Sequence, residues 1–187
     1  MGRLIYFTGG ARSGKSREAE RYIKVRNYQD KIYLATSIPF DKEMKDRIKK
    51  HKDQRGENWK TLEGYENLID LVRPNLKGKG VILLDCITNL VSNMMILNND
   101  YDWDNISMDE VNNLEEKIIK EIESFLEYIK STDYDCVIVS NELGMGLVPT
   151  YPLGRYFRDI CGRANQIVAR ESKEVYFLVS GILRRIK

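Results

Sequence analysis

The sequence predicts an α/β fold with a mostly parallel central sheet flanked by helices, and three observations support this. Compact apolar segments alternate with longer amphipathic segments, as strands and crossover helices do. The apolar segments are rich in Val, Ile, Leu and Tyr, as strands buried on both faces are. A glycine-rich loop joins the first strand to the first helix. With 187 residues and no repeat or linker, we expect one catalytic domain over residues 1–187.

Five apolar segments are predicted strands because each is short, continuous and rich in β-formers. They are Leu4–Thr8, Lys31–Thr36, Val81–Asp85, Cys136–Ser140 and Val175–Ser180. Trp59–Leu62 is a further, shorter candidate.

Six segments have the polarity and length of helices. They are Lys15–Arg26, Lys42–Gln54, Tyr65–Val72, Asn89–Leu97, Met108–Lys130 and Leu153–Arg170. The longest has apolar residues at positions 111, 114, 118, 122, 125, 126 and 129, which form one amphipathic stripe. The polar and acidic segment 98–107 before it is predicted to be a surface loop.

Composition excludes several classes of protein. The formal net charge is +2, so nucleic acid is not an expected partner. Cys86, Cys136 and Cys161 are widely spaced, which argues against a disulfide framework or a zinc site and favours buried free thiols. No apolar run approaches the roughly 20 residues that span a bilayer, and the chain begins at a strand without a signal peptide. We therefore expect a cytoplasmic protein with no membrane span.

The glycine-rich loop matches the phosphate-binding pattern G-x-x-x-x-G-K-[ST]. Its glycines let successive backbone N–H groups point inward at phosphate oxygens, and the following helix adds its positive end. Lys15 would reach the β- and γ-phosphates, and the Ser16 hydroxyl would ligate Mg²⁺. The loop residues are Gly9, Gly10, Ala11, Arg12, Ser13, Gly14, Lys15 and Ser16. The sequence thus predicts a nucleoside triphosphate site.

Asp85 ends an apolar strand and is the candidate second element of that site. A carboxylate there can hold Mg²⁺, directly or through water, or contact the nucleotide sugar. Taken alone the pattern is weak, because apolar strands often end in Asp.

The single histidine, His51, lies in a basic segment. On a helix, Arg47, His51 and Arg55 share one face. Such a cationic face lowers the pKa of the imidazole and keeps it nucleophilic, and a neutral imidazole beside an α-phosphate can form a phosphoramidate. The alternative is a solvated basic helix that contains one histidine, and the spacing alone favours that alternative.

The segment Asn141–Pro149 follows a predicted strand, at the sheet edge where ligands bind in parallel sheets. An ordinary strand-to-helix connection explains it equally well. In the helix that follows, Asp159 and Arg163 are spaced to pair, and Gly162 suggests close packing against a neighbour, within the chain or outside it.

Together these segments resemble the adenosylcobinamide kinase / adenosylcobinamide-phosphate guanylyltransferase family of cobalamin biosynthesis, over nearly the whole chain. The P-loop alone is widespread, but its combination with the other motifs is specific. Those motifs are Thr8–Ser16, Ala35-Thr-Ser37, Asp41-x-Glu-Met44, Arg47-Ile48 with His51, Trp59, Leu84-Asp-Cys-Ile-Thr-Asn89, Asn141-Glu-x-Gly-Met-Gly-x-Val-Pro149 and Phe157-Arg-Asp-Ile-Cys-Gly-Arg-x-Asn-Gln166.

The resemblance implies a RecA-like P-loop fold, a homotrimer and a covalently guanylylated histidine, a place that His51 holds. The resemblance therefore favours a reactive His51 over the solvated basic helix that the spacing alone favours. The trimer makes Tyr65–Leu97 or the helix Leu153–Arg170 candidate interface material. The nucleotide contacts that it implies fall on Gly9–Ser16, Ala35, Thr36, Ser37, Lys52, Asp53, Gln54, Arg55, Glu63 and Asp85.

The expected activity has two steps at one nucleotide site. ATP or GTP with Mg²⁺ first phosphorylates adenosylcobinamide, and GTP then guanylylates His51, which passes GMP to adenosylcobinamide phosphate. The bulky corrinoid is expected near Asn141–Pro149. Two alternatives remain open, a P-loop small-molecule kinase in which His51 is idle and a P-loop regulatory ATPase.

Overall fold

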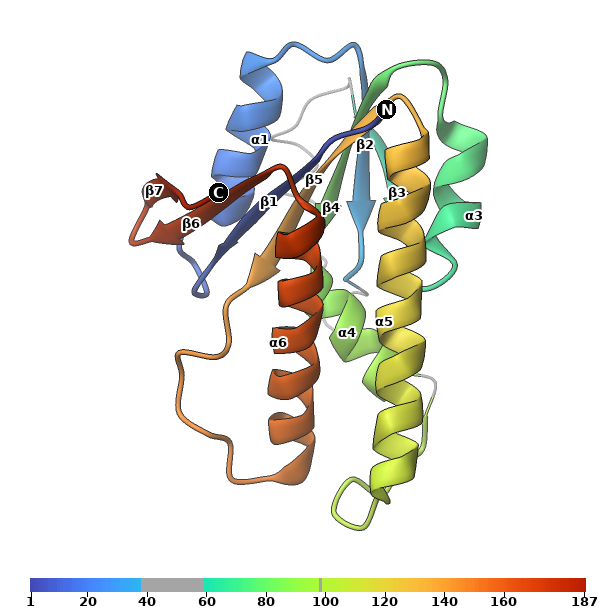
Figure 1. The fold of residues 1–187 in the computed structure, drawn as a ribbon, viewed down its shortest axis with the longest axis vertical. Helices are drawn as coiled ribbons and strands as arrows, with labels where there is room; N and C mark the ends of the chain where they lie inside the picture. The colour runs from blue at the N-terminus through green and yellow to red at the C-terminus, as the bar shows by residue number, and fades with distance from the viewer. Residues whose placement is uncertain (38–58, 98) are drawn as a thin grey trace.

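The computed structural model describes residues 1–37, 59–97 and 99–187, and the predicted helix 42–54 lies outside the described residues. Within these ranges one seven-stranded sheet has the order β3-β2-β4-β5-β1-β6-β7, shown in Figure 1. Every neighbouring pair is parallel except β6 and β7. The strands are β1 (Leu4–Gly9), β2 (Asp30–Ala35), β3 (Lys60–Glu63), β4 (Gly80–Asp85), β5 (Tyr134–Asn141), β6 (Glu174–Val179) and β7 (Ile182–Arg185).

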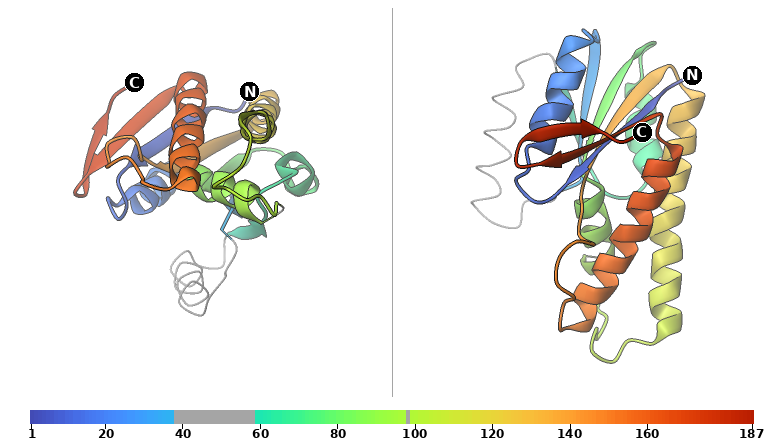
Figure 2. Two further views of the ribbon diagram at one scale, coloured as in Figure 1. Left: turned by 90° about the horizontal axis from the view of Figure 1, so that it is seen from below. Right: turned by 60° about the vertical axis from the view of Figure 1, so that its left-hand side comes forward.

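The helices cover the two faces of the sheet unequally. The described helices are α1 (Lys15–Val25), α3 (Leu68–Val72), α4 (Ile87–Ile96), α5 (Met108–Ser131) and α6 (Pro152–Glu171), with a 3₁₀ turn at Arg73–Asn75. Figure 2 shows α1 on one side of the sheet and α5 and α6 on the other. Because strand side chains alternate between faces, even-numbered residues of β1 and β5 face α5 and α6, and odd-numbered ones face α1. The central strands β1, β4 and β5 are therefore buried on both sides, as their continuous apolar sequences predict.

Helix α5 confirms the predicted stripe. Its buried residues are Val111, Leu114, Ile118, Ile122, Phe125, Leu126 and Ile129. A capping box starts the helix, because Ser107 Oγ accepts from the Glu110 N–H and the Glu110 carboxylate accepts from the Ser107 N–H. The segment before it, within 99–107, is a loop.

The C-terminal hairpin differs from the prediction. Ser180, predicted to end a strand, lies in the turn between β6 and β7 with φ 49°, and Gly181 follows with φ 81°. Strand β7 was not predicted because its four residues are all exposed at the sheet edge, so they carry no alternation of apolar and polar side chains.

Two features of α6 bear on the sequence predictions. A Cβ placed on Gly162 would meet no atom of the described structure within 4 Å, so the described residues do not supply the close packing that this glycine suggests. The guanidinium of Arg163 forms its ion pair with Glu115 of α5 instead of with Asp159. This ion pair joins α6 to the neighbouring helix α5.

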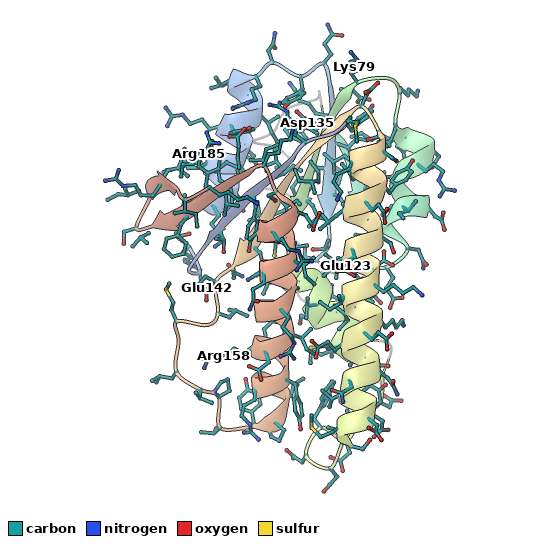
Figure 3. All side chains as sticks on the ribbon, viewed as in Figure 1. Lys79, Glu123, Asp135, Glu142, Arg158 and Arg185 are labelled. Atoms are coloured by element: carbon teal, nitrogen blue, oxygen red, sulfur yellow. The ribbon has the colours of Figure 1, made fainter. Side chains whose placement is uncertain are left out.

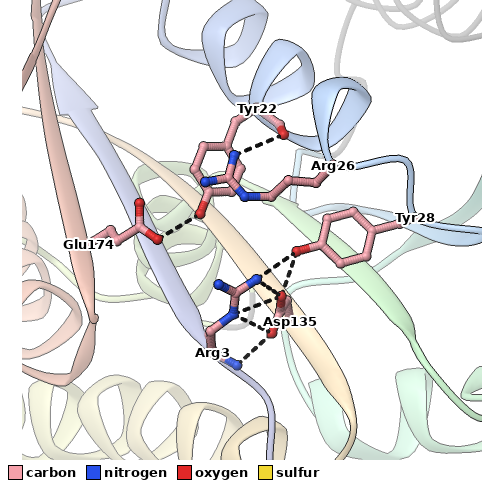
Figure 4. A network of polar contacts seen from close by, with 6 residues as sticks. All are labelled: Arg3, Tyr22, Arg26, Tyr28, Asp135 and Glu174. Carbon is pink, nitrogen blue, oxygen red and sulfur yellow. Dashed lines mark hydrogen bonds and ion pairs between the residues drawn. The ribbon is translucent and has the colours of Figure 1, made fainter.

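A polar network closes the amino ends of the strands, at the edge opposite the P-loop. Figure 4 shows Arg3 donating to the Asp135 carboxylate at 2.6 Å, with the Tyr28 hydroxyl donating to the same carboxylate at 2.5 Å. Nearby, the Tyr22 hydroxyl donates to Glu174 at 2.9 Å. These contacts join β1, β5 and β6 to α1 and the segment that follows it.

All three cysteines are buried and free, as predicted. No helix in the described ranges is both long and apolar enough to cross a bilayer.

Candidate nucleotide-binding site

The loop after β1 has the backbone conformation that a P-loop requires. Gly9 and Gly14 take φ values of 151° and 96°, and Arg12 takes 56°, so the chain curls back on itself before α1 begins. A Cβ on Gly9 would lie 2.3 Å from the Leu178 carbonyl oxygen, which explains why glycine stands there. The start of α1, where Gly14 precedes Lys15, has no side-chain cap, so its first N–H groups are available to an anion.

Lys15 is folded back onto its own loop. Its ammonium donates to the Gly10 carbonyl at 2.7 Å, and its side chain is largely buried. Burial lowers the pKa of Lys15, while the nearby Cys86 and Asp85 act in the opposite direction. The charge of Lys15 is thus held over the P-loop, where its ammonium donates to a backbone carbonyl.

Ser13 adds a second sign of a ligand at the loop. Its hydroxyl oxygen is buried and has no hydrogen-bond partner among the described residues. Buried polar atoms are nearly always paired, so an unpaired hydroxyl beside a helix N-terminus fits a bound phosphate.

The turn between β6 and β7 contacts the phosphate loop and supports it. The Gly181 N–H donates to the Ser13 carbonyl at 3.0 Å, and Gly14 approaches the Gly181 Cα. No local pattern in the sequence predicts this contact, since the turn lies about 170 residues along the chain from the loop that it supports. The turn dipeptide Ser180-Gly181 is the signal that would have found the hairpin.

Asp85 lies at the same edge of the sheet, as predicted. It ends β4, which is separated from β1 by β5 alone, and its charge acts on Lys15. The Tyr33 hydroxyl donates to its Oδ2 at 3.2 Å. Ser16 lies half-buried in the first turn of α1.

Asp85 and Ser16 fit Mg²⁺ because both present oxygen atoms, which this cation prefers. The described residues contain no cluster of three or more His, Cys, Asp or Glu side chains suited to a metal. Mg²⁺ at phosphate sites needs no such cage, since it takes one or two protein oxygens together with phosphates and water.

The end of β2 supplies Ala35, Thr36 and Ser37 to the same edge. The Thr36 hydroxyl is already engaged, because it donates to the Cys86 carbonyl at 2.6 Å and accepts from the Cys86 N–H at 2.8 Å. It therefore joins β2 to β4, and its buried position leaves the half-buried Ser37 as the more accessible hydroxyl.

Among the described residues, Glu63 is the predicted contact that is not drawn together with the P-loop. Glu63 is exposed at the end of β3, the strand farthest from β1 on that side of the sheet. His51 and the predicted contacts Lys52, Asp53, Gln54 and Arg55 lie outside the described residues.

The segment after β5 forms a long loop that ends at α6. Its first residues contact the P-loop strand, since the Glu142 N–H donates to the Gly9 carbonyl at 2.9 Å. Farther along, Leu147 is 96% exposed and Met145 is 81% exposed. A loop that begins at the phosphate site thus carries large apolar side chains in solvent.

Comparisons with known proteins give this site its context. A family model described as "Cobinamide kinase / cobinamide phosphate guanyltransferase" matches residues 5–186. The chain belongs to this family. It is 40% identical over 191 residues to the "Bifunctional adenosylcobalamin biosynthesis protein CobU" of Escherichia coli, covering 98% of this chain and 99% of that protein. The corresponding protein of Salmonella typhimurium is 41% identical over 188 residues, with the same coverage.

A more distant relative is the "Bifunctional adenosylcobalamin biosynthesis protein CobP" of Pseudomonas aeruginosa, 32% identical over 96% of this chain and 94% of that protein. Among solved structures, an ATPase from a bacterial type III secretion system matches with a TM-score of 0.55 and 8% identity, covering 96% of this chain and 51% of that chain. This likeness concerns the fold alone, which is an α/β RecA-like domain.

Proposed function

We propose that this chain is a bifunctional transferase of cobalamin biosynthesis, acting as one catalytic domain. It phosphorylates adenosylcobinamide and then converts the phosphate to adenosylcobinamide-GDP through a guanylylated His51. The observation that carries the proposal is a match to the family over residues 5–186 in a chain whose P-loop has the geometry to hold phosphates.

In the kinase step, the N–H groups of Gly9–Ser16 bind the phosphates, and Lys15 leaves the Gly10 carbonyl to reach the terminal phosphate oxygens. Ser16 and Asp85 would hold Mg²⁺ together with ATP or GTP, and the cation would supply positive charge against the phosphates. The loose transition state of phosphoryl transfer asks mainly for positioning and charge stabilisation, which a buried lysine and preorganised amides supply.

In the guanylyltransferase step, the His51 ring attacks the α-phosphate of GTP, and the pyrophosphate leaves while the P-loop binds it. An oxygen of adenosylcobinamide phosphate then displaces His51. Lys52–Arg55, Ala35–Ser37 and Glu63 are the further nucleotide contacts that we propose, on the strength of the family resemblance.

The corrinoid is proposed to lie over the loop between β5 and α6. The exposed Met145 and Leu147 suit the apolar surface of a large ring, and the loop starts beside the P-loop. Homotrimer formation, implied by the resemblance, and a cytoplasmic location, expected from the composition, complete the proposal.

The test is the intact mass of the purified protein after incubation with GTP and Mg²⁺. We expect the wild type to gain one GMP, Lys15→Ala to gain it far more slowly, and His51→Ala to gain none. Asp109→Asn, a charge change at an exposed position of α5, is the matched control and should behave as the wild type.

Other outcomes separate the alternatives. A folded wild type that phosphorylates adenosylcobinamide without forming the adduct is a kinase in which His51 is idle. Nucleotide hydrolysis that is independent of any corrinoid, again without an adduct, identifies a regulatory ATPase.

A further inference from the structure

The kinase step requires a group that takes the proton of the attacking hydroxyl, and the P-loop supplies none. Carboxylates are common in this role because they can accept a proton as the new oxygen–phosphorus bond forms. The position directly after Asp85 is occupied by Cys86, whose pKa burial raises to about 12. That thiol remains protonated near neutral pH and does not serve as a base.

Glu142 is the carboxylate that the fold places beside the phosphate loop. Gly9 is paired with Asn141 in the β1–β5 register, so Glu142 follows at the point where the P-loop leaves the sheet. Neighbouring strands lie about 4.8 Å apart, and β5 stands directly between β1 and β4. Glu142 therefore directly follows β5, the strand that lies between β1, which leads into the phosphate loop, and β4, which ends at Asp85, the proposed metal ligand.

The side chain of Glu142 is oriented by the loop that follows it. Its Oε1 accepts from the Gly144 N–H at 2.5 Å, and the Gly144 carbonyl accepts from Arg158 of α6 at 2.9 Å. Figure 3 shows Glu142 at the end of β5, near the loop that joins β1 to α1, with Arg158 on the neighbouring α6. Gly144 thus links Arg158 to the carboxylate.

Glu142 also lies on the side of the sheet edge where an acceptor would approach. The alternation along β5 directs even-numbered positions toward α6, and the charge of Glu142 acts on Tyr6, which is on that face. Asp85 and α1 occupy the opposite face. A nucleotide bound along α1 and an acceptor over the apolar loop would meet between these two carboxylates.

The other carboxylates that the described residues bring to this edge are less suitable. Asp85 accepts from Tyr33 and is proposed to hold the metal. Glu63 ends β3, which is separated from β1 by three strands and hence by about 19 Å at the usual strand spacing.

We propose that Glu142 is the general base of the kinase step, an inference that rests on the proposed function. The substrate hydroxyl oxygen forms a bond to the γ-phosphorus while its proton passes to the Glu142 carboxylate. The bond between the γ-phosphorus and the bridging oxygen breaks, and the nucleoside diphosphate leaves with that electron pair. Glu142 then releases the proton to water. Arg158 is a positioning residue that holds the turn at Gly144.

The experiment compares the two activities, phosphorylation and guanylylation, in the same preparations of the protein. Phosphorylation of adenosylcobinamide is measured at saturating acceptor for the wild type, Glu142→Gln and Glu142→Ala, the last with and without sodium formate. Guanylylation by GTP alone is measured by intact mass on the same preparations. Glu116→Gln makes the same chemical change on the exposed face of α5 and is the control.

Glu142→Gln is expected to lower kcat of phosphorylation about 10²-fold, leaving guanylylation within about twofold of the wild type, since that step involves no acceptor hydroxyl. Formate is expected to restore part of the activity of Glu142→Ala. An unchanged kcat, or a parallel loss of both activities, would overturn the assignment. A wild type that neither phosphorylates adenosylcobinamide nor gains GMP would instead overturn the proposed function, before any variant is considered.

Discussion

Thr36 illustrates how one side chain can belong to a site without offering its polar group to a ligand. Its hydroxyl is fully engaged with the N–H and the carbonyl of Cys86, and Asn93 donates to its backbone carbonyl at 2.6 Å. These bonds fix the end of β2 against the end of β4, where Asp85 is. The contribution of Thr36 to nucleotide binding is therefore expected to be indirect.

Replacing Thr36 by Val keeps the shape of the side chain and leaves the buried N–H of Cys86 unpaired, while the Cys86 carbonyl loses one of its two donors and keeps the Leu90 N–H. We expect the free energy of unfolding to fall by about 2 kcal/mol, the usual cost of losing such partners. Urea unfolding measures the loss, and GTP binding below the transition tests the site. An unchanged stability with greatly weakened binding would show that the hydroxyl contacts the nucleotide.

Among the elements, α6 contains a glycine, Gly162, that no contact with the described residues explains. Gly162 lies in the helix interior, where glycine is unfavourable, and the space around its missing Cβ is open.

Gly162→Ala is expected to stabilise the isolated chain by about 1 kcal/mol, because alanine has the higher helix propensity and no atom of the described structure obstructs it. Thermal unfolding at low protein concentration is the measurement. A loss of stability that appears only at high concentration would contradict this expectation, and would mean that a second copy packs closely on the glycine.

The elements that the sequence predicts well are those whose pattern is local. The P-loop, the α5 stripe and Asp85 are each encoded within a few turns or one strand, so they are found where expected. The hairpin turn at Gly181 and the Glu142 contact with Gly9 depend on pairing between distant strands, which no local pattern encodes. His51 was identified by resemblance, and its placement stays a prediction.

At the scale of the whole molecule, the residues that bind phosphate and a network that stabilises the fold lie at opposite edges of the sheet. The carboxyl edge carries the phosphate loop, and the amino edge carries the Arg3–Asp135–Tyr28 network. Burial opposes the charge of Asp135, but its hydrogen bonds to Arg3 and Tyr28 outweigh burial and lower its pKa.

A lowered carboxyl pKa makes the network dependent on pH. Its contribution is complete above the unfolded-state pKa of about 3.9 and is lost as pH falls through the lower folded value. Asp135→Asn should therefore cost about 2 kcal/mol at pH 7 and progressively less below pH 4. Urea unfolding across that range is the measurement, with the exposed Asp133→Asn as the control. A cost that stays constant with pH would contradict the assignment.

The strand order has a consequence for how the protein is made. Both neighbours of β1 come from the last third of the chain, and the N–H that closes the phosphate loop belongs to Gly181. Synthesis reaches β1 long before β5, its first partner, and β6, its second. The phosphate loop therefore cannot gain its support from Gly181 until β6 and the turn after it have been made, so an early segment is among the last to acquire its native contacts.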